Sequence, residues 1–287
     1  MRRMQVKLAK EMGFCFGVRR GVSQVERAAQ ERGPLQTLGS LVHNQQVVDR
    51  LGESGVKAVH DLDEVKGETV AIATHGVARE VIEEAKARGI EVIDVTCPYV
   101  KLIQEKARQM HEAGFQVVVF GDRGHTEVIG IVGWTKGRAI VVSAPEEISA
   151  LPRAKKVGIV AQTTQSIDAY EKVISRLVAR CLPRSIELRI HNTICNATAL
   201  RQSAAVKLAD SVDVMVVVGG KNSANTRRLA ELCQAKGVPT HHVEDAGELQ
   251  TSWFAACNTV GVTAGASTPD WVIDEVVKRL EAMEVAD

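Results

Sequence analysis

One local pattern occurs three times in this chain: a strand-like segment, a turn, a cysteine and then a helix-like segment. Cys15 follows MQVKLA, Cys97 follows IEVIDVT, and Cys195 follows IELRIHNTI. Beyond each cysteine, apolar residues recur three or four positions apart, which is the period of an amphipathic helix. Pro98 directly follows Cys97, and proline suits the first helical turn because its missing N–H would have no partner there. The sequence therefore predicts three copies of one strand–cysteine–helix unit.

The loops repeat as well. A polar residue lies 28 positions after each cysteine: His43, His125 and Ser223. A further strand-like segment follows in each third (TVAIATHG, KVGIVAQTTQS and NTVGVTAGAST), and the loop after it holds His75, Thr163 with Thr164, and Ser267. Ligands of parallel α/β sheets bind at the carboxyl ends of the strands. We therefore predict an α/β protein of three pseudo-symmetric small lobes, in a trefoil arrangement around one shared centre, with boundaries at 1–97, 98–194 and 195–287.

Composition narrows the functional class. Lysine and arginine number 36 against 35 acidic residues, and the sequence has no basic stripe of the kind that binds nucleic acid. Apolar runs such as VDVMVVVGG are too short to cross a membrane, and the N-terminus lacks the apolar core of a signal peptide. We expect a cytoplasmic protein without a nucleic-acid or membrane partner. In a reducing compartment, its six cysteines are not expected to form disulfides.

The repeated cysteines call for a different explanation from the other three. Cys181, Cys233 and Cys257 lie outside the repeat and are interpreted as packing residues, as most buried cysteines are. Zinc sites usually pair their ligands at short spacing, whereas the three repeated cysteines are 82 and 98 residues apart. Thiolates also favour iron–sulfur clusters, and three of them leave the fourth iron of a four-iron cluster without a protein sulfur. An open iron can act as a Lewis acid, which favours catalysis.

The loop residues suit an anionic substrate. Phosphate oxygens accept hydrogen bonds from imidazoles, hydroxyls, amides and glycine backbone N–H groups. The predicted loops supply these donors from His43, His75, His125, Ser223, Asn225, Ser267, Gly219, Gly220 and Gly265. Glu127 has no obvious charge partner in the sequence. It is either a solvated acid at a helix N-terminus or, near a cluster and an anion, a candidate proton donor.

Nine short motifs occur in an order that resembles the 4-hydroxy-3-methylbut-2-enyl diphosphate reductase family. They are GFCFGV, LVHN, ATHGV, DVTCP, GHTEV, AQTTQS, CNATALRQ, GGKNSANTRRL and TAGASTPD, and they extend from about residue 12 to the C-terminal helix. The resemblance implies a three-lobed α/β fold around one [4Fe–4S] cluster per chain. The implied cluster ligands are Cys15, Cys97 and Cys195.

The resemblance also implies a reaction, the last step of the methylerythritol phosphate route to isoprenoids. The substrate oxygen binds the open iron, and two electrons and two protons remove it as water, giving isopentenyl and dimethylallyl diphosphate. Electrons would come from a flavodoxin or ferredoxin. Glu127 would deliver a proton with help from Thr163, and His125 would lie near both the diphosphate and the reacting group. Residues implied in binding the substrate are His43, His75, His125, Thr163, Ser223, Asn225 and Ser267.

The chain departs from the family pattern at one position. Family members usually read S-S-N where this chain has Ser223, Ala224 and Asn225. One lost hydroxyl corresponds to a hydrogen bond worth about 0.5–1.5 kcal/mol. The other donors remain, so the substitution bears on affinity more than on activity.

Three other classes remain open from the residues alone. One is another three-cysteine [4Fe–4S] enzyme, such as a hydro-lyase or a quinolinate synthase-like enzyme, which needs no external electrons. A second is a non-enzymatic iron–sulfur redox sensor, which should not bind diphosphate. A third is a phosphate-binding α/β protein with cysteines in its core, which should be colourless.

The ligand assignment predicts different behaviour for two cysteines. Cys97→Ser should lose cluster iron, because it removes a thiolate ligand, whereas Cys233→Ser should keep the iron content of the parent protein. Iron analysis of the two variants after anaerobic purification checks this. Equal iron content would contradict the three-ligand assignment.

Overall fold

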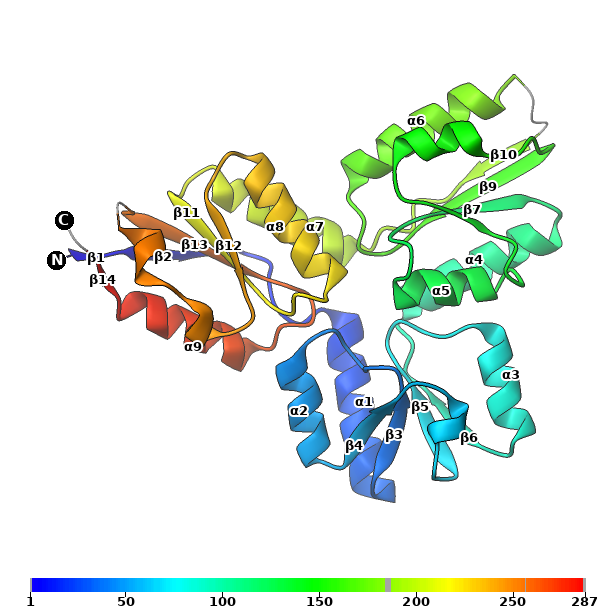
Figure 1. Cartoon of the computed structure of the whole chain (residues 1–287), viewed down its shortest axis with the longest axis horizontal. Helices are drawn as coiled ribbons and strands as arrows, with labels where there is room; N and C mark the ends of the chain where they lie inside the picture. The colour runs from blue at the N-terminus through cyan, green and yellow to red at the C-terminus, as the bar shows by residue number, and fades with distance from the viewer. Residues whose placement is uncertain (1, 184–186, 256, 286–287) are drawn as a thin grey trace. The chain divides into compact units, whose positions relative to one another are not determined.

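Three parallel four-stranded sheets with one common strand order form the framework of the protein (Figure 1). The computed structural model describes residues 2–183, 187–255 and 257–285. The first sheet has the order β4 (Val56–Val59), β3 (Leu35–Leu38), β5 (Thr69–Ile72), β6 (Glu91–Asp94). The second has the order β8 (Ile140–Val142), β7 (Gln116–Phe120), β9 (Lys156–Ala161), β10 (Glu187–Ile190). The predicted fold class, three α/β lobes, is confirmed.

The third sheet takes one strand from the other end of the chain. Its order is β12 (Thr240–Val243), β11 (Val214–Val218), β13 (Thr259–Ala264), β2 (Gln5–Leu8). The N-terminal strand β2 thus occupies the place that β6 and β10 occupy in the other sheets, and it pairs in parallel with β13. The predicted boundaries place β2 in the segment 1–97, whereas β2 pairs with β13 of the third sheet. The boundaries 1–97, 98–194 and 195–287 stay a prediction.

The chain forms two compact units. One contains the N-terminal segment to Arg19, His43–Asp49 and the segment from Asn196 onward, with the third sheet. The other contains Arg20–Val42 and Arg50–Cys195, with the first and second sheets.

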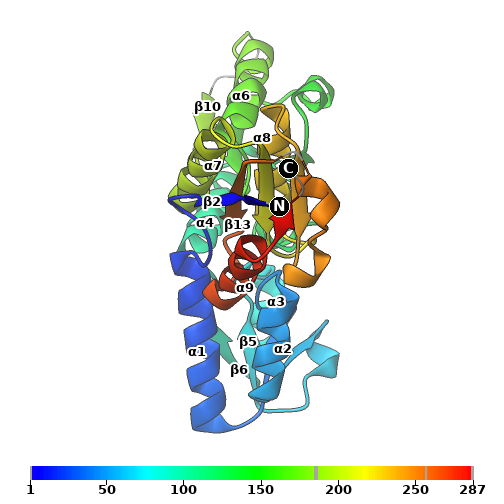
Figure 2. The same ribbon diagram turned by 90° about the vertical axis from the view of Figure 1, so that its left-hand side faces the viewer.

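Helices connect the parallel strands, as right-handed crossovers require. The first sheet is flanked by α1 (Phe16–Arg32), α2 (Gln45–Glu53) and α3 (Arg79–Ala87). The second is flanked by α4 (Pro98–Glu112), α5 (Thr126–Gly133) and α6 (Ile167–Cys181), and the third by α7 (Asn196–Ala209), α8 (Ala224–Ala235) and α9 (Asp270–Glu281). Figure 2 shows α1 lying along the first sheet. Short elements complete the fold: η1 (Leu62–Glu64), η2 (Pro145–Ala150), η3 (Ala246–Glu248), η4 (Thr251–Phe254) and the antiparallel pair β1 (Arg2–Arg3) and β14 (Glu284–Val285).

The second sheet illustrates how alternation builds the core. Val157, Ile159 and Ala161 of β9 pack with α6, whereas Val160 points to the opposite face and packs with α4 and α5. Successive side chains of a strand point to opposite faces, so a strand covered on both sides is apolar throughout. At Gly158, an added Cβ would lie 2.3 Å from the Met110 sulfur, so α4 packs closely on this strand.

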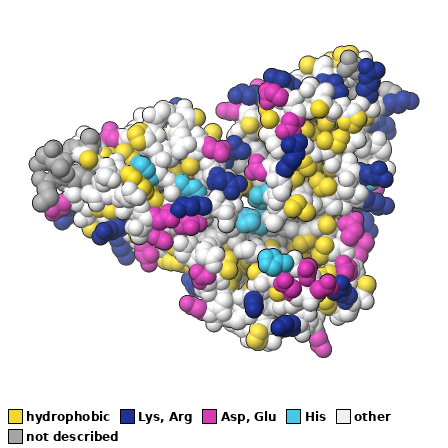
Figure 3. All heavy atoms as spheres, viewed as in Figure 1, with side chains coloured by type: hydrophobic (Ala, Val, Ile, Leu, Met, Phe, Trp, Pro, Cys, Tyr) yellow, Lys and Arg dark blue, Asp and Glu magenta, His cyan; other side chains and the backbone are white. Residues whose placement is uncertain are grey.

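The surface mixes charges of both signs. Acidic and basic side chains are interspersed over the face drawn in Figure 3. Among the described residues, no helix is both long and apolar enough to cross a membrane.

Two leucines of the α6 region should differ in their contribution to stability. Leu177 is fully buried between α6 and the second sheet, whereas Leu182 at the end of α6 is 72% exposed. Leu177→Ala should lower the free energy of unfolding by about 2–5 kcal/mol, because it leaves a cavity. Leu182→Ala should change it by less than about 0.5 kcal/mol. Urea unfolding of both variants checks this, and equal losses would contradict the packing described.

Candidate active site

Each repeated cysteine is held in the same way. The cysteine follows the edge strand β2, β6 or β10, and its backbone N–H donates to the loop after the neighbouring strand, which is β13, β5 or β9. The acceptor is the carbonyl of the residue two positions after that neighbouring strand ends. The donor–acceptor pairs, with distances of 2.9, 3.1 and 3.0 Å, are Cys97 to Thr74, Cys195 to Thr163 and Cys15 to Ala266. The sequence predicted equivalent positions from spacing alone, and the hydrogen bonds give that equivalence a physical basis.

The three repeated cysteines share one setting. In the described part of the chain none of them forms a disulfide, and each is partly buried directly before a helix, whereas Cys181, Cys233 and Cys257 are buried. The N–H of Val18 in the first turn of α1 donates to the Cys15 sulfur at 3.5 Å. Cys15 belongs to one unit and the other two cysteines to the other, so the meeting of all three stays a prediction.

The residues 28 positions beyond the cysteines lie at helix beginnings. His125 caps α5, and its Nδ1 accepts from the N–H of Glu127 at 3.2 Å. Ser223 caps α8, and its hydroxyl accepts from the N–H of Thr226 at 3.3 Å. His43 lies just before α2, where the Asn44 side chain accepts from the N–H of Val47. The first turns of α5 and α8 therefore start at predicted site residues, where the positive helix end favours anions.

Glu127 is a buried carboxyl group that Thr163 holds through both of its oxygens. Its two oxygens accept from the N–H and the hydroxyl of Thr163, both at 2.7 Å. Glu127 lies in the first turn of α5 and is buried, so the alternative of a solvated acid at a helix end is excluded. The carbonyl of Thr163 also accepts from the N–H of Cys195. Thr163 thus connects the candidate proton donor to a candidate cluster ligand.

The environment of Glu127 favours the protonated acid. Burial raises the pKa of its carboxyl to about 7, the two hydrogen bonds from Thr163 partly oppose this, and the nearby charge of Asp122 raises it further. A carboxyl group with a pKa near neutrality can both give and regain a proton under physiological conditions. Glu127 therefore stays a candidate proton donor.

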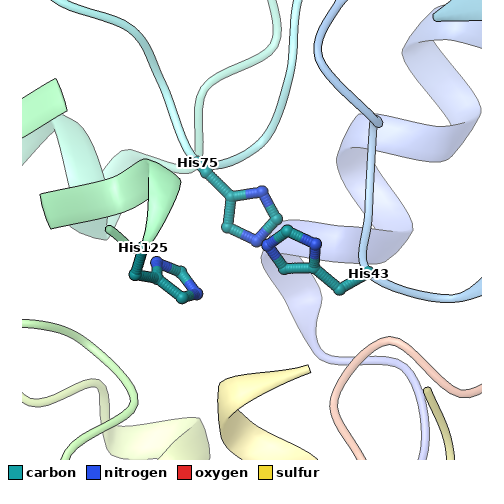
Figure 4. Close-up of side chains that lie close together, drawn as sticks. All are labelled: His43, His75 and His125. Atoms are coloured by element: carbon teal, nitrogen blue, oxygen red, sulfur yellow. The ribbon is translucent and has the colours of Figure 1, made fainter. Parts of the chain in front are cut away.

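Two histidines accompany this carboxyl. His75 lies in the loop after β5, and its ring makes an edge-to-face contact with that of His125, with centroids 5.6 Å apart (Figure 4). Because Nδ1 of His125 accepts from a backbone N–H, its neutral ring carries the proton on Nε2 and can donate from there.

The sequence did not single out the polar network behind Glu127. The Gln162 side chain accepts from the N–H of Asp122 at 2.8 Å and donates to the Thr164 hydroxyl at 2.9 Å. The Gln165 amide donates to the Asp122 carboxylate at 3.0 Å. These residues connect the loop before α5 with the loop before α6. The signal was present in AQTTQS, where two glutamines flank the threonines that the repeat identified.

The loop before α8 forms a second polar site, in the unit with the third sheet. Both polar atoms of the Asn225 side chain are buried, and neither has a hydrogen-bond partner among the described residues. Buried polar groups are normally hydrogen-bonded, so an orphaned amide in a helix first turn indicates a ligand. Ala224, beside it, is also buried.

Close packing shapes this second site. An added Cβ at Gly220 would lie 2.4 Å from the His43 carbonyl oxygen, and one at Gly265 would lie 2.0 Å from the Thr226 hydroxyl. The Ser267 hydroxyl donates to the His43 carbonyl at 3.3 Å. Burial, with the charge of Arg227, lowers the pKa of His43 and keeps the imidazole neutral. His43, Ser223, Asn225 and Ser267 thus come from three loops of one unit.

A model of the protein family described as "LytB protein" matches residues 6–281. A protein of Geobacter metallireducens named 4-hydroxy-3-methylbut-2-enyl diphosphate reductase is 49% identical over 283 residues, with 99% of each chain covered. A protein of the same name from Dehalococcoides mccartyi is 43% identical over 281 residues, covering 98% of this chain and 99% of the relative.

Two solved structures resemble the chain. One is described as (E)-4-hydroxy-3-methyl-but-2-enyl diphosphate reductase, the terminal enzyme of the non-mevalonate pathway; it is 42% identical, with a TM-score of 0.70, and the match covers 98% of this chain and 100% of that one. The other is the E-1-hydroxy-2-methyl-but-2-enyl-4-diphosphate reductase of Plasmodium falciparum, which is 26% identical, with a TM-score of 0.91 and coverage of 96% and 88%.

The raised pKa of Glu127 predicts a pH-dependent cost to stability. The folded protein holds this proton more tightly than the unfolded chain, so stability is complete below about pH 4.5 and falls as the pH rises to about 7. The loss is about 1.4 kcal/mol per pH unit in that window at most. Glu127→Gln should remove this component. Urea unfolding at pH 5 and pH 7.5 checks it, and an unchanged difference between the two proteins would contradict the assignment.

Proposed function

Because the chain belongs to the LytB protein family, we propose that it reduces 4-hydroxy-3-methylbut-2-enyl diphosphate to isopentenyl and dimethylallyl diphosphate. Each turnover breaks the bond between carbon and the hydroxyl oxygen, consumes two electrons and two protons, and releases water. The observation that carries this proposal is the arrangement of Glu127, Thr163 and Cys195. One threonine donates two hydrogen bonds to a buried acid and accepts one from a candidate cluster ligand.

We propose one [4Fe–4S] cluster per chain, held by Cys15, Cys97 and Cys195. The donor set fits such a group: three partly buried cysteines, each at a helix beginning and each with an equivalent backbone hydrogen bond. When bound, the cluster supplies electrons and an iron with Lewis-acid character. The electrons come from a flavodoxin or ferredoxin.

Glu127 supplies a proton to the departing oxygen. With a pKa of about 7, the carboxyl is substantially protonated in neutral solution, and the two bonds from Thr163 hold its position. A group held in place loses little entropy when it reacts, which is how positioned acids raise rates. His125 donates from Nε2 and orients the polar end of the substrate beside this acid, with His75 next to it.

The diphosphate binds in the site before α8. Asn225 donates its orphaned amide to a phosphate oxygen, the hydroxyls of Ser223 and Ser267 add donors, and the α8 N-terminus adds favourable electrostatics. Neutral His43 serves as a hydrogen-bond donor rather than as a charge. The close packing at Gly220 and Gly265 brings these three loops together.

Replacing the proposed proton donor should abolish turnover without removing cofactor or substrate binding. Glu127→Gln keeps the shape of the side chain but cannot donate a proton, so the turnover rate should fall about 10²–10⁴-fold. Product analysis with dithionite as reductant, together with iron content and substrate affinity, measures this. Glu112→Gln, an exposed glutamate of α4, is the control. Near-normal turnover of Glu127→Gln would remove this residue from the mechanism.

The orphaned amide should contribute to substrate affinity. Asn225→Ala removes a hydrogen bond to a charged group, worth about 1.5–3 kcal/mol, so the substrate dissociation constant should rise about 10–100-fold. Asn258→Ala, at an exposed asparagine, should leave it unchanged. Calorimetric titration of both anaerobic proteins checks this; equal affinities would move the diphosphate to a different site.

A further inference from the structure

We propose that one flank of α4 is the docking surface for a small acidic electron-transfer protein. The surface, called the α4 patch below, comprises Arg20, Tyr99, Leu102 and Lys106, all within the unit that holds the first and second sheets. The inference rests on the proposed function, because that reaction consumes two electrons that no group of the substrate supplies. It adds to the function the place at which the electrons enter.

Large apolar side chains are exposed beside Cys97. Tyr99 is 43% exposed and Leu102 is 50% exposed, although α4 buries Val100, Ile103 and Ala107 on its other side. Tyr99, Leu102 and Lys106 are spaced three and four residues apart, so they lie along one face of the helix. A single exposed apolar residue is ordinary, but neighbouring ones at the beginning of a ligand-bearing helix indicate a contact surface.

The same exposure recurs after the other candidate ligands. Leu200 is 46% exposed and lies five residues after Cys195, as Leu102 lies five residues after Cys97. Phe16, directly after Cys15, is 65% exposed. Exposed apolar side chains thus follow all three candidate ligands and are not confined to one sheet.

Positive charge accompanies the apolar residues. Arg20 donates to the carbonyl of Thr96, next to Cys97, at 3.4 Å. Neither Arg20 nor Lys106 forms an ion pair with an acid in the described part of the chain, whereas the neighbouring Lys101 pairs with Asp94 at 2.7 Å. The charge of Lys106 acts on two titratable neighbours: it lowers the pKa of His191, after burial, and it contributes to the lowered pKa of Glu105.

These features fit one kind of partner. Basic groups outside ion pairs steer an acidic protein to the surface, and exposed apolar side chains stabilise a short-lived complex once it forms. Docking on the α4 patch brings the partner's redox group close to Cys97, which is two residues from Tyr99. The partner is oxidised by one electron in each encounter, and two encounters complete one turnover.

The test compares two reductants on the intact cluster-containing enzyme. Leu102→Glu combined with Lys106→Glu reverses the charge and removes the apolar contact. With reduced flavodoxin as donor at low ionic strength, kcat/KM for flavodoxin should fall at least about tenfold, since steering contributes 10-fold or more to association. With dithionite, which needs no docking surface, the turnover rate should not change. Leu182→Glu combined with Lys172→Glu, on exposed positions of α6, is the matched control and should affect neither rate.

The possible outcomes separate this inference from the proposed function. An unchanged flavodoxin-supported rate in the α4 variant would overturn the inference, and so would an equal fall with both reductants or an equal fall in the control. A single substitution, Lys106→Glu, should reproduce a smaller selective loss that disappears at high salt. Absence of turnover in the parent enzyme with dithionite would instead refute the proposed function itself.

Discussion

The site depends on one hydrogen bond that each repeated cysteine forms. Its backbone N–H donates to the loop after the neighbouring strand of its sheet, β5, β9 or β13. The bond fixes the backbone of the cysteine at the carboxyl end of a parallel sheet, where α/β proteins place their chemistry. Because the strand order is the same in all three sheets, the bond recurs without any identity of sequence around it. In the third sheet the edge strand beside β13 is β2, which comes from the N-terminal end of the chain. The third copy of the repeat is therefore built from both ends of the sequence.

The surroundings of Glu127 and of Asn225 differ in how they satisfy a buried polar side chain. Around Glu127, burial favours the protonated acid, and Thr163 donates to both of its oxygens. Before α8, by contrast, closely packed glycines and a helix end provide donors, and the Asn225 amide has no hydrogen-bond partner among the residues that the structure describes. The first region favours a protonated acid, and the second offers hydrogen-bond donors of the kind that anions accept. Membership of the LytB family decides against the hydro-lyase, redox-sensor and simple phosphate-binding alternatives.

Much of this was predictable from spacing. The repeat of strand, cysteine and helix predicted three α/β lobes. The spacing of 28 residues identified His125 and Ser223 as polar loop residues, and the structure adds that both cap helices. Other features depend on contacts that spacing does not encode. The pairing of β2 with β13 joins the ends of the chain, and the burial of Glu127 depends on α5 packing against the loop of Thr163. The network of Gln162, Gln165 and Asp122 was missed because amide side chains carry no periodic signal.

The most direct test of the account is to purify the protein without oxygen and to measure iron, sulfide and visible absorption before adding 4-hydroxy-3-methylbut-2-enyl diphosphate with dithionite. The account predicts a brown protein with about four irons and four sulfides per chain that forms both isopentenyl and dimethylallyl diphosphate. A protein that stays colourless after reconstitution with iron and sulfide would contradict the shared cluster. A brown protein that leaves the substrate unchanged would contradict the reaction.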